Sequence, residues 1–468
     1  GKEAAMMGFW KKSRLWRAAG VILAAVMLPA AAGCSMQVEP YLVPPKLQGE
    51  QLEIQKALDE YVTGTLKMPH YIMKYPKNRG QTSAFIRTSL EVDWITKNMA
   101  DTEQEPEEVA IAFYQDAAKT GNVHINMLRT VDGDWASVSD VEGLGTDIEN
   151  VAFGDLDGDG LKEMLIGWNI YNSQEKQLHV YSMRNDTLTP VSTDNLYTEW
   201  FLGDVTSSGK DDLVLFRLEG NNRVTARLKT LQDGRMTDGG TVSLDGYIQR
   251  FGSMKIGKLA DGVNGLYVDA TRDANTTITE LIYWDKQLYA PFYDPASNAT
   301  LLTARTSGLA SRDIDTDGQV EYPICTRLPG YYETTEPQEY MWLTQWYSWD
   351  YAAQQVQAEF YSLVNTTDGY YIRLEDAWKD QVTATYEAQT HTLMVCTAPD
   401  GKIGEPFLAV RVTRDGSAAP ASASIPDADF KLWYEDEATG TTYRFWYSED
   451  NPFGINDQSP LYMLGLLI

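Results

Sequence analysis

Short apolar runs separated by turns rich in Asp, Asn and Gly follow one another through most of this chain. Between about residues 100 and 350 one pattern returns: an Asp- or Gly-rich loop and then an apolar strand. The copies are FGDLDGDGLKEMLIGW (153–168), LGDVTSSGKDDLVLF (202–216), IGKLADGVNGLYV (256–268) and SRDIDTDGQVEYPI (311–324). Their loops begin at Asp155, Asp204, Lys258 and Asp313. Each interval between these positions is roughly 50 residues, which predicts a structural repeat of that length.

Each copy continues with a strand, a polar turn and another strand, as in LHVYSMRNDTLTPV and LIYWDKQLYAPF. A further copy lies upstream, at 106–114 and 125–138, although its loop has lost the Asp-Gly pattern. A four-stranded unit cannot bury both of its faces alone, and radial stacking of such units buries them while leaving few exposed edges. The pattern therefore predicts a mainly β fold, a β-propeller of about five four-stranded blades over residues 76–362. A β-sandwich array is the rival, but the single period argues against it.

The flanking segments differ from the repeat. Residues 34–75 combine a Pro-rich, polar tether with apolar residues at helical spacing in EQLEIQKALDEYV, which predicts one short helix over Glu50–Val62. After Val364 the period ends, and strands alternate with polar turns. We expect residues 363–468 to form a small, β-rich α+β domain.

The segment 1–33 has the pattern of an export signal. Basic residues between Lys11 and Arg17 precede an apolar run that ends in small residues. This run, Ala18–Gly33, is shorter than the roughly 20 apolar residues that a membrane span needs. Its end, Ala31-Ala32-Gly33-Cys34, resembles the lipobox of bacterial lipoproteins, although Ala31 stands where leucine is usual. The resemblance implies a protein anchored to the membrane through lipidated Cys34, on its extracytoplasmic face. An ordinary cleaved signal with an incidental cysteine is the alternative.

Charge excludes one class of partner. The chain carries a formal net charge of −27, with 66 acidic residues against 39 Lys and Arg. Such a body repels phosphate backbones, so we expect no nucleic-acid partner. The acidic surface instead suits solubility and cation binding.

Two loops carry oxygen ligands at regular positions. Carboxylates stand at loop positions 1, 3, 5 and 9, a glycine at position 6, and a backbone carbonyl at position 7 completes each set. The residues are Asp155, Asp157, Asp159, Leu161 and Glu163 in one loop, and Asp313, Asp315, Asp317, Gln319 and Glu321 in the other. Ca²⁺ prefers six to eight such oxygens, so we expect calcium as a cofactor. The alternative is a turn in which the Asp side chains accept hydrogen bonds from their own loop.

The other loops are weaker candidates. Asp204, Thr206, Ser208 and Asp212 keep an oxygen at each position but lose two carboxylates, and Lys258 opens the remaining loop. An EF-hand would need a glutamate at position 12, where the full loops have Ile166 and Ile324. With the preceding Phe153-Gly154, the loops resemble the FG-GAP (VCBS-like) repeats of integrin α-subunits and many bacterial surface proteins. The order of the predicted domains also resembles uncharacterised lipoproteins of Firmicutes, especially clostridia.

The sequence contains no familiar catalytic motif. Its four histidines are scattered, and HExxH, GxSxG, Walker and Rossmann patterns are absent. We therefore expect no enzyme, but a binding or scaffold module for an unknown protein or glycan. A cell-envelope hydrolase built on a propeller is the alternative. Cys325 and Cys396 can pair in an oxidising compartment, although cysteines in separate segments are more often unpaired.

Overall fold

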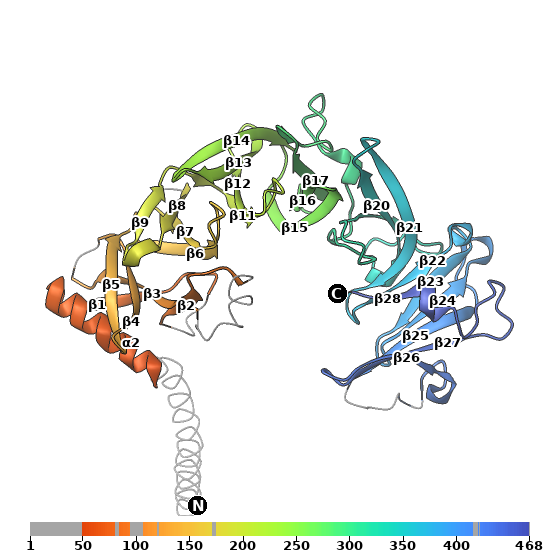
Figure 1. Cartoon of the computed structure of the whole chain (residues 1–468). Helices are drawn as coiled ribbons and strands as arrows, with labels where there is room; N and C mark the ends of the chain where they lie inside the picture. Colours follow the sequence, from red (N-terminus) through yellow and green to blue (C-terminus); the bar gives the residue numbers. More distant parts are fainter. Residues whose placement is uncertain are drawn as a thin grey trace, which may run out of the picture. The chain divides into compact units, whose positions relative to one another are not determined.

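The computed structural model describes residues 49–79, 84–93, 106–118, 121–170, 175–414, 420 and 422–467 (Figure 1). The predicted signal segment and Cys34 lie outside these residues. No helix in the described part of the chain is long and apolar enough to cross a membrane. The chain divides into two compact units, one from residues up to Thr88 with Glu108–Glu142, the other from Ser89–Glu107 with Gly143–Ile468.

The first unit combines one helix with one sheet. Helix α2 (Glu50–Asp59) continues into a π-helical segment, Glu60–Thr65, which confirms the helix predicted here. Ile54, Leu58 and Val62, spaced four residues apart, are buried together against the sheet. The sheet is antiparallel, with the order β1-β3-β4-β5 and β2 beside β3. Its strands are β1 (Tyr71–Lys74), β2 (Ile86–Ser89), β3 (Glu108–Asp116), β4 (His124–Val131) and β5 (Asp134–Glu142).

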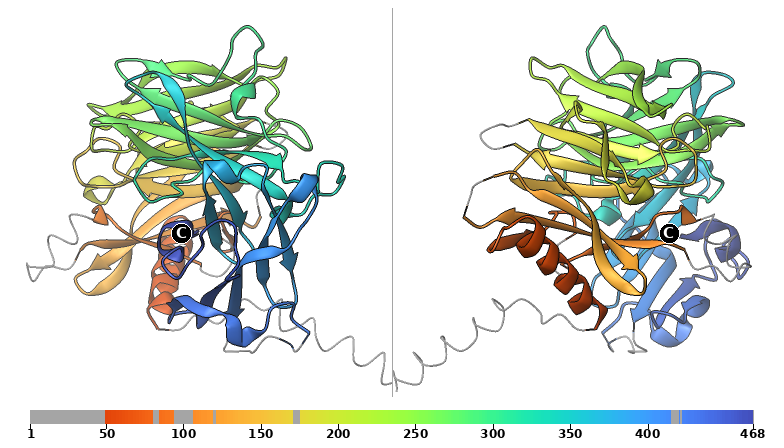
Figure 2. Two further views of the ribbon diagram at one scale, coloured as in Figure 1. Left: turned by 90° about the vertical axis from the view of Figure 1, so that its right-hand side faces the viewer. Right: turned by 60° about the vertical axis from the view of Figure 1, so that its left-hand side comes forward.

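The second unit begins with three antiparallel sheets that follow one another in sequence order (Figure 2). The first contains β6 (Asp147–Gly154), β7 (Glu163–Asn169), β8 (Lys176–Ser182), β9 (Thr189–Ser192) and β10 (Leu196–Tyr197). The second contains β11 (Glu199–Gly203), β12 (Asp212–Leu218), β13 (Val224–Gln232) and β14 (Arg235–Leu244). The third contains β15 (Arg250–Ala260), β16 (Val263–Thr271), β17 (Thr277–Trp284) and β18 (Leu288–Tyr289). In the first two of these sheets an Asp-containing loop joins the first two strands, and in the third the short turn at Asp261-Gly262 does so.

Two further sheets complete the second unit. The fourth has the order β19-β20-β21-β22-β28, so the last strand of the chain pairs with β22. It contains β19 (Tyr322–Arg327), β20 (Trp342–Asp350), β21 (Gln355–Asn365), β22 (Tyr370–Leu374) and β28 (Leu464–Leu466). The fifth contains β23 (Val382–Glu387), β24 (Thr392–Thr397), β25 (Pro406–Arg414), β26 (Lys431–Asp436) and β27 (Thr441–Tyr447), and helix α4 (Pro460–Met463) precedes β28. Strand β21 runs through the predicted domain boundary between residues 362 and 363.

The predicted class, a mainly β fold with successive four- or five-stranded antiparallel sheets of the propeller type, is confirmed. The closure of about five blades into a ring stays a prediction.

The glycine of the repeated pattern allows neighbouring sheets to approach closely. A Cβ on Gly154 would lie 2.6 Å from Asp211 Oδ2, a side chain of the next sheet. A Cβ on Gly257 would lie 2.9 Å from the backbone nitrogen of Val320, at the start of the following sheet. Because real Cβ atoms do not come this close, any larger residue would push the sheets apart. The glycine in the sequence pattern therefore reflects sheet-to-sheet packing.

Candidate functional site

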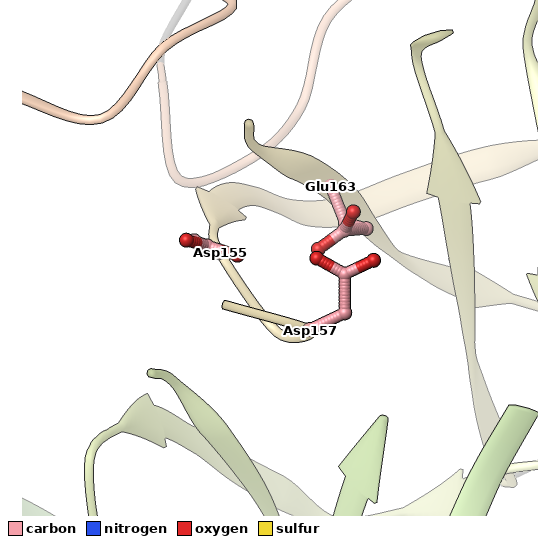
Figure 3. A group of neighbouring side chains, drawn as sticks. All are labelled: Asp155, Asp157 and Glu163. Carbon is pink, nitrogen blue, oxygen red and sulfur yellow. The ribbon is translucent and has the colours of Figure 1, made fainter. Parts of the chain in front are cut away.

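The first Asp loop joins β6 and β7. Asp155 accepts hydrogen bonds from the backbone N–H groups of Gly158 (2.7 Å) and Gly160 (2.8 Å), and Glu163 accepts one from Leu156 (2.8 Å). One carboxylate oxygen each from Asp155, Asp157 and Glu163 lie within 4.8 Å of one another. Figure 3 shows the carboxylates of Asp157 and Glu163 facing each other.

A guanidinium group already lies in this loop. Arg184, from the turn after β8, is 2.7 Å from Asp157, 2.6 Å from Asp159 and 3.2 Å from Glu163, measured from its Nη2 to a carboxylate oxygen. Burial opposes ionisation of Asp157, but hydrogen bonds and the charge of Arg184 outweigh it, so the pKa of Asp157 is lowered. The cationic partner of these carboxylates is thus part of the chain.

The loop that begins at Asp313 precedes β19 and is closed by a similar set of hydrogen bonds. Asp313 accepts hydrogen bonds from the N–H groups of Asp317 and Gly318, both at 3.0 Å, and Glu321 accepts one from Ile314 at 3.0 Å. One carboxylate oxygen each from Asp313, Asp315 and Glu321 lie within 4.8 Å of one another.

In the second loop the negative charges are not compensated. Within the described ranges no Lys, Arg or His forms an ion pair with Asp313, Asp315 or Glu321. Burial and the charges of the neighbouring aspartates raise the pKa of Glu321 to about 8, although the hydrogen bond from Ile314 opposes this shift. A divalent cation bound here would remove this repulsion, so the donor set fits calcium better than the first loop does.

Each loop gathers three of its predicted ligands. Asp159 contacts Arg184 and accepts the N–H of Leu161 (2.9 Å), while Asp317 accepts the N–H of Gln319 (2.8 Å). These position-5 carboxylates are outside the two three-residue groups. In both loops, position 1 stabilises the turn and position 9 closes it.

The loop at Asp204 is closed by its own hydrogen bonds. Asp204 accepts the N–H groups of Ser208 and Gly209, each at 2.9 Å. Asp212 accepts both the N–H and the hydroxyl of Thr206, each at 2.8 Å. Among the described residues no group of three metal-type ligands forms at this loop. Its geometry is that of a polar turn.

The loops also connect neighbouring sheets. Asp155 and Asp211 exchange two hydrogen bonds, from Asp211 N to Asp155 O (2.8 Å) and from Asp155 N to Asp211 Oδ2 (3.1 Å). Asn264 donates to the carbonyl of Asp204 (2.8 Å). Lys258 N donates to the carbonyl of Gly318 (2.9 Å). The loops at Asp155, Asp204 and Lys258 are therefore each bonded to the next sheet or its loop.

A pocket that the sequence patterns missed lies in the fourth sheet and the segment before it. Its volume is about 360 Å³, and Trp342 and Glu339 line it together with hydroxyl-bearing side chains. These are Thr306, Ser307, Thr344 and Thr366. A smaller pocket of about 110 Å³ shares Glu339 and Val364 with the first and adds the side chains of Tyr340 and Tyr386. No sequence motif marks this site, because its walls come from segments far apart in the chain.

A buried carboxylate stands behind the smaller pocket. Asp368 is fully buried and accepts hydrogen bonds from Tyr386 Oη (2.7 Å) and Asn365 Nδ2 (3.1 Å). His391 Nδ1 lies 2.8 Å from the other carboxylate oxygen. Burial and then Asp368 raise the pKa of Tyr386, so this phenol stays protonated at the pocket wall. Cys325 at the larger pocket and Cys396 are free thiols.

No family model and no curated protein matches the sequence. Solved structures with similar folds include an exotype rhamnogalacturonan lyase, with 12% identity, a TM-score of 0.28, and coverage of 72% of this chain and 76% of that one. An α-L-arabinofuranosidase from Fusarium graminearum has 12% identity and a TM-score of 0.30, covering 80% of this chain and 96% of the other. The Dos1 propeller has 8% identity and a TM-score of 0.27, and the match covers 72% of this chain and 64% of that one.

These comparisons correct one expectation. The prediction that the chain is not an enzyme is contradicted, because the similar structures include a lyase and a glycosidase. The propeller part of the predicted resemblance agrees with the similar structures, whereas no sequence family, including FG-GAP, matches.

Proposed function

We propose that this chain is a glycan-active protein of the cell envelope, a hydrolase built on propeller-type sheets and held to the membrane through lipidated Cys34. The larger pocket is its glycan site. The observation that carries this proposal is the presence of an indole ring, a carboxylate and several hydroxyl groups around one cavity of about 360 Å³.

The chemistry of the pocket suits a sugar. The C–H face of a pyranose packs against an aromatic ring, and Trp342 is the aromatic residue that lines this cavity. Sugar hydroxyls both donate and accept hydrogen bonds, as do Thr306, Ser307 and Thr344. A volume of this size is in the usual range for small-molecule sites, about 300–1,000 Å³.

Replacing Trp342 with alanine should weaken oligosaccharide binding at least about tenfold, because a stacked aromatic ring contributes on the order of 1.4 kcal/mol or more. The purified chain is screened against a panel of envelope and plant oligosaccharides by calorimetry, and release of reducing ends is followed in parallel. Trp433 on β26, partly buried and outside the pocket, provides the matched control, Trp433→Ala. Equal affinities of the parent and Trp342→Ala would reject this pocket as the glycan site, and binding without reducing-end release would reject hydrolysis.

We further propose that calcium is a cofactor and that the loop from Asp313 to Glu321 is its main site. Its support is the uncompensated carboxylates of that loop, in contrast to the loop at Asp155, where Arg184 supplies a positive charge. Asp204 and its neighbours would bind calcium more weakly or not at all, because their oxygens are already used within the turn.

Calcium should therefore stabilise the chain through one loop. We take about 1 mM free Ca²⁺ and a dissociation constant of about 0.1 mM, which is within the range of extracellular modules. Calcium then raises the free energy of unfolding by RT ln 11, or about 1.4 kcal/mol. Asp315→Asn should remove most of the calcium-dependent rise in melting temperature, and Asp157→Asn should leave it nearly unchanged. Arg184→Ala should add a second calcium-dependent increment, because it frees the first loop. Identical melting curves of the parent in EDTA and in calcium would show that both loops are turns only.

A further inference from the structure

Glu339 is a partly buried carboxylate whose described partners are neutral. It accepts hydrogen bonds from the backbone N–H of Thr366 and from the Thr367 hydroxyl (3.3 Å), both in the turn between β21 and β22. No Lys, Arg or His of the described chain forms an ion pair with it. A carboxylate withdrawn from water without a cation carries a desolvation cost that neutral donors offset only in part.

The nearby guanidinium groups are committed elsewhere. Arg414 donates to the Thr367 carbonyl and to Asp368 Oδ1, both at 3.4 Å. Arg327 lies over the Trp342 ring, with Cζ 4.2 Å from its centroid, and donates to the Thr334 carbonyl (3.1 Å). Glu339 is moreover the one charged side chain among the residues that line either pocket. A ligand that enters these pockets therefore meets a single, negative, formal charge.

The smaller pocket has the dimensions and walls of an ammonium site. Its volume is about 110 Å³, enough for an amino group and the carbon that bears it. The rings of Tyr340 and Tyr386, with centroids 6.1 Å apart, form part of the wall, and aromatic faces attract cations. Asn365 and Thr367 add polar groups beside the carboxylate.

We propose that this pair of pockets recognises an amino sugar with a free, protonated amino group. The sugar ring occupies the larger pocket against Trp342, and its ammonium group donates to Glu339 at the wall that the two pockets share. An ammonium group has three donors and no acceptor, which matches a carboxylate flanked by neutral oxygen atoms. This inference rests on the proposed glycan function and names the class of glycan that the site takes.

The test compares three oligosaccharides of equal length: β-1,4-linked glucosamine, its N-acetylated form, and the glucose oligomer without nitrogen. Binding to the full chain is measured by calorimetry at a pH where the amine is protonated. We expect the glucosamine oligomer to bind at least tenfold more tightly than the other two. Glu339→Gln keeps a hydrogen-bond acceptor for Thr366 and should abolish this preference, so that the glucosamine and glucose oligomers bind the variant with equal affinity. Glu336→Gln, an exposed neighbour outside both pockets, is the matched control and should retain the preference.

A salt titration of the unmodified chain gives a second, mutation-free readout, because an ion pair at a partly exposed site weakens as ionic strength rises. The preference for the glucosamine oligomer over the other two should therefore decrease as the salt concentration is raised. Equal affinity for all three oligomers, or a preference that survives Glu339→Gln, would overturn the ammonium site but leave the glycan function standing. Absence of binding to every oligosaccharide, in the broader panel as well, would instead reject the glycan function itself.

Discussion

Replacing Asp269 with alanine should lower the free energy of unfolding by about 3–5 kcal/mol, because it leaves a buried guanidinium without its counter-charge. Asp269 on β16 is 3.1 Å from Arg305 Nη2, and the Arg305 side chain is fully buried. The carboxylate also accepts hydrogen bonds from Ser253 (2.7 Å), Thr279 (2.6 Å) and Ser311 N–H (2.9 Å). One side chain thus joins three strands to the segment after β18.

This network positions one wall of the glycan pocket. Arg305 also donates from Nε to the Leu309 carbonyl (2.8 Å), across the stretch from Thr306 to Leu309 that lines the larger pocket. Loss of Asp269 should therefore reduce ligand binding as well as stability. Urea unfolding of Asp269→Ala is compared with Asp273→Ala, which changes an exposed carboxylate nearby.

A double variant, Asp269→Leu with Arg305→Met, removes both charges. It should recover a large part of the lost stability, because the unpaired charge rather than the lost pair dominates the penalty. A change below about 1 kcal/mol in the single variant would place this pair in the class of exposed ion pairs and contradict the prediction.

The second large effect is a dependence of stability on pH from Glu280. Its side chain is completely buried on β17, and burial raises its pKa to about 7 despite hydrogen bonds from Asp245 N–H (2.8 Å) and the Thr300 hydroxyl (2.7 Å). Its second oxygen has no hydrogen-bond partner among the described residues. In the unfolded chain the carboxyl ionises near pH 4.5.

The sign follows from proton binding. Between pH 4.5 and 7 the folded state holds a proton that the unfolded state has lost, so stability falls as the pH rises. A pKa shift of this size contributes about 3 kcal/mol to the free energy of unfolding at low pH. This contribution is lost progressively as the pH rises to about 8. Glu280→Gln should remove this slope and make the protein more stable than the parent at pH 8. The free energy of unfolding is measured by equilibrium unfolding at pH 5, 6, 7 and 8, and Glu333→Gln at an exposed site is the control. Parallel pH profiles of the parent and Glu280→Gln would contradict the prediction.

Local features of the chain were predictable from its sequence. Helical spacing from Ile54 to Val62 predicts α2, and the glycine that precedes three of the four loops marks where sheets approach. Asp155 and Asp313 adopt the position expected at the start of an oxygen-rich loop. These features depend on residues within about ten positions of one another, a distance over which sequence patterns are informative.

Features made by distant segments were not predictable. Arg184 reaches back along the chain to Asp157 and Glu163 from the far side of two strands, and no spacing rule distinguishes it from other exposed arginines. The glycan pocket joins Glu339 to the turn at Thr366 and to side chains near residue 306. Both depend on how sheets and connecting segments pack, which a single sequence without a motif does not encode locally.

The hydrogen bonds between successive Asp loops have a consequence for how such a chain can evolve. At three consecutive junctions a loop of one unit is bonded to the next unit: Asp155 to Asp211, Asp204 to Asn264, and Lys258 to Gly318. Because each of these junctions concerns only nearest neighbours, a whole unit can be duplicated or lost without redesign of the others. A substitution within one unit can then change its loop alone, and the Arg184-occupied loop differs in this way from the acidic loop at Asp313.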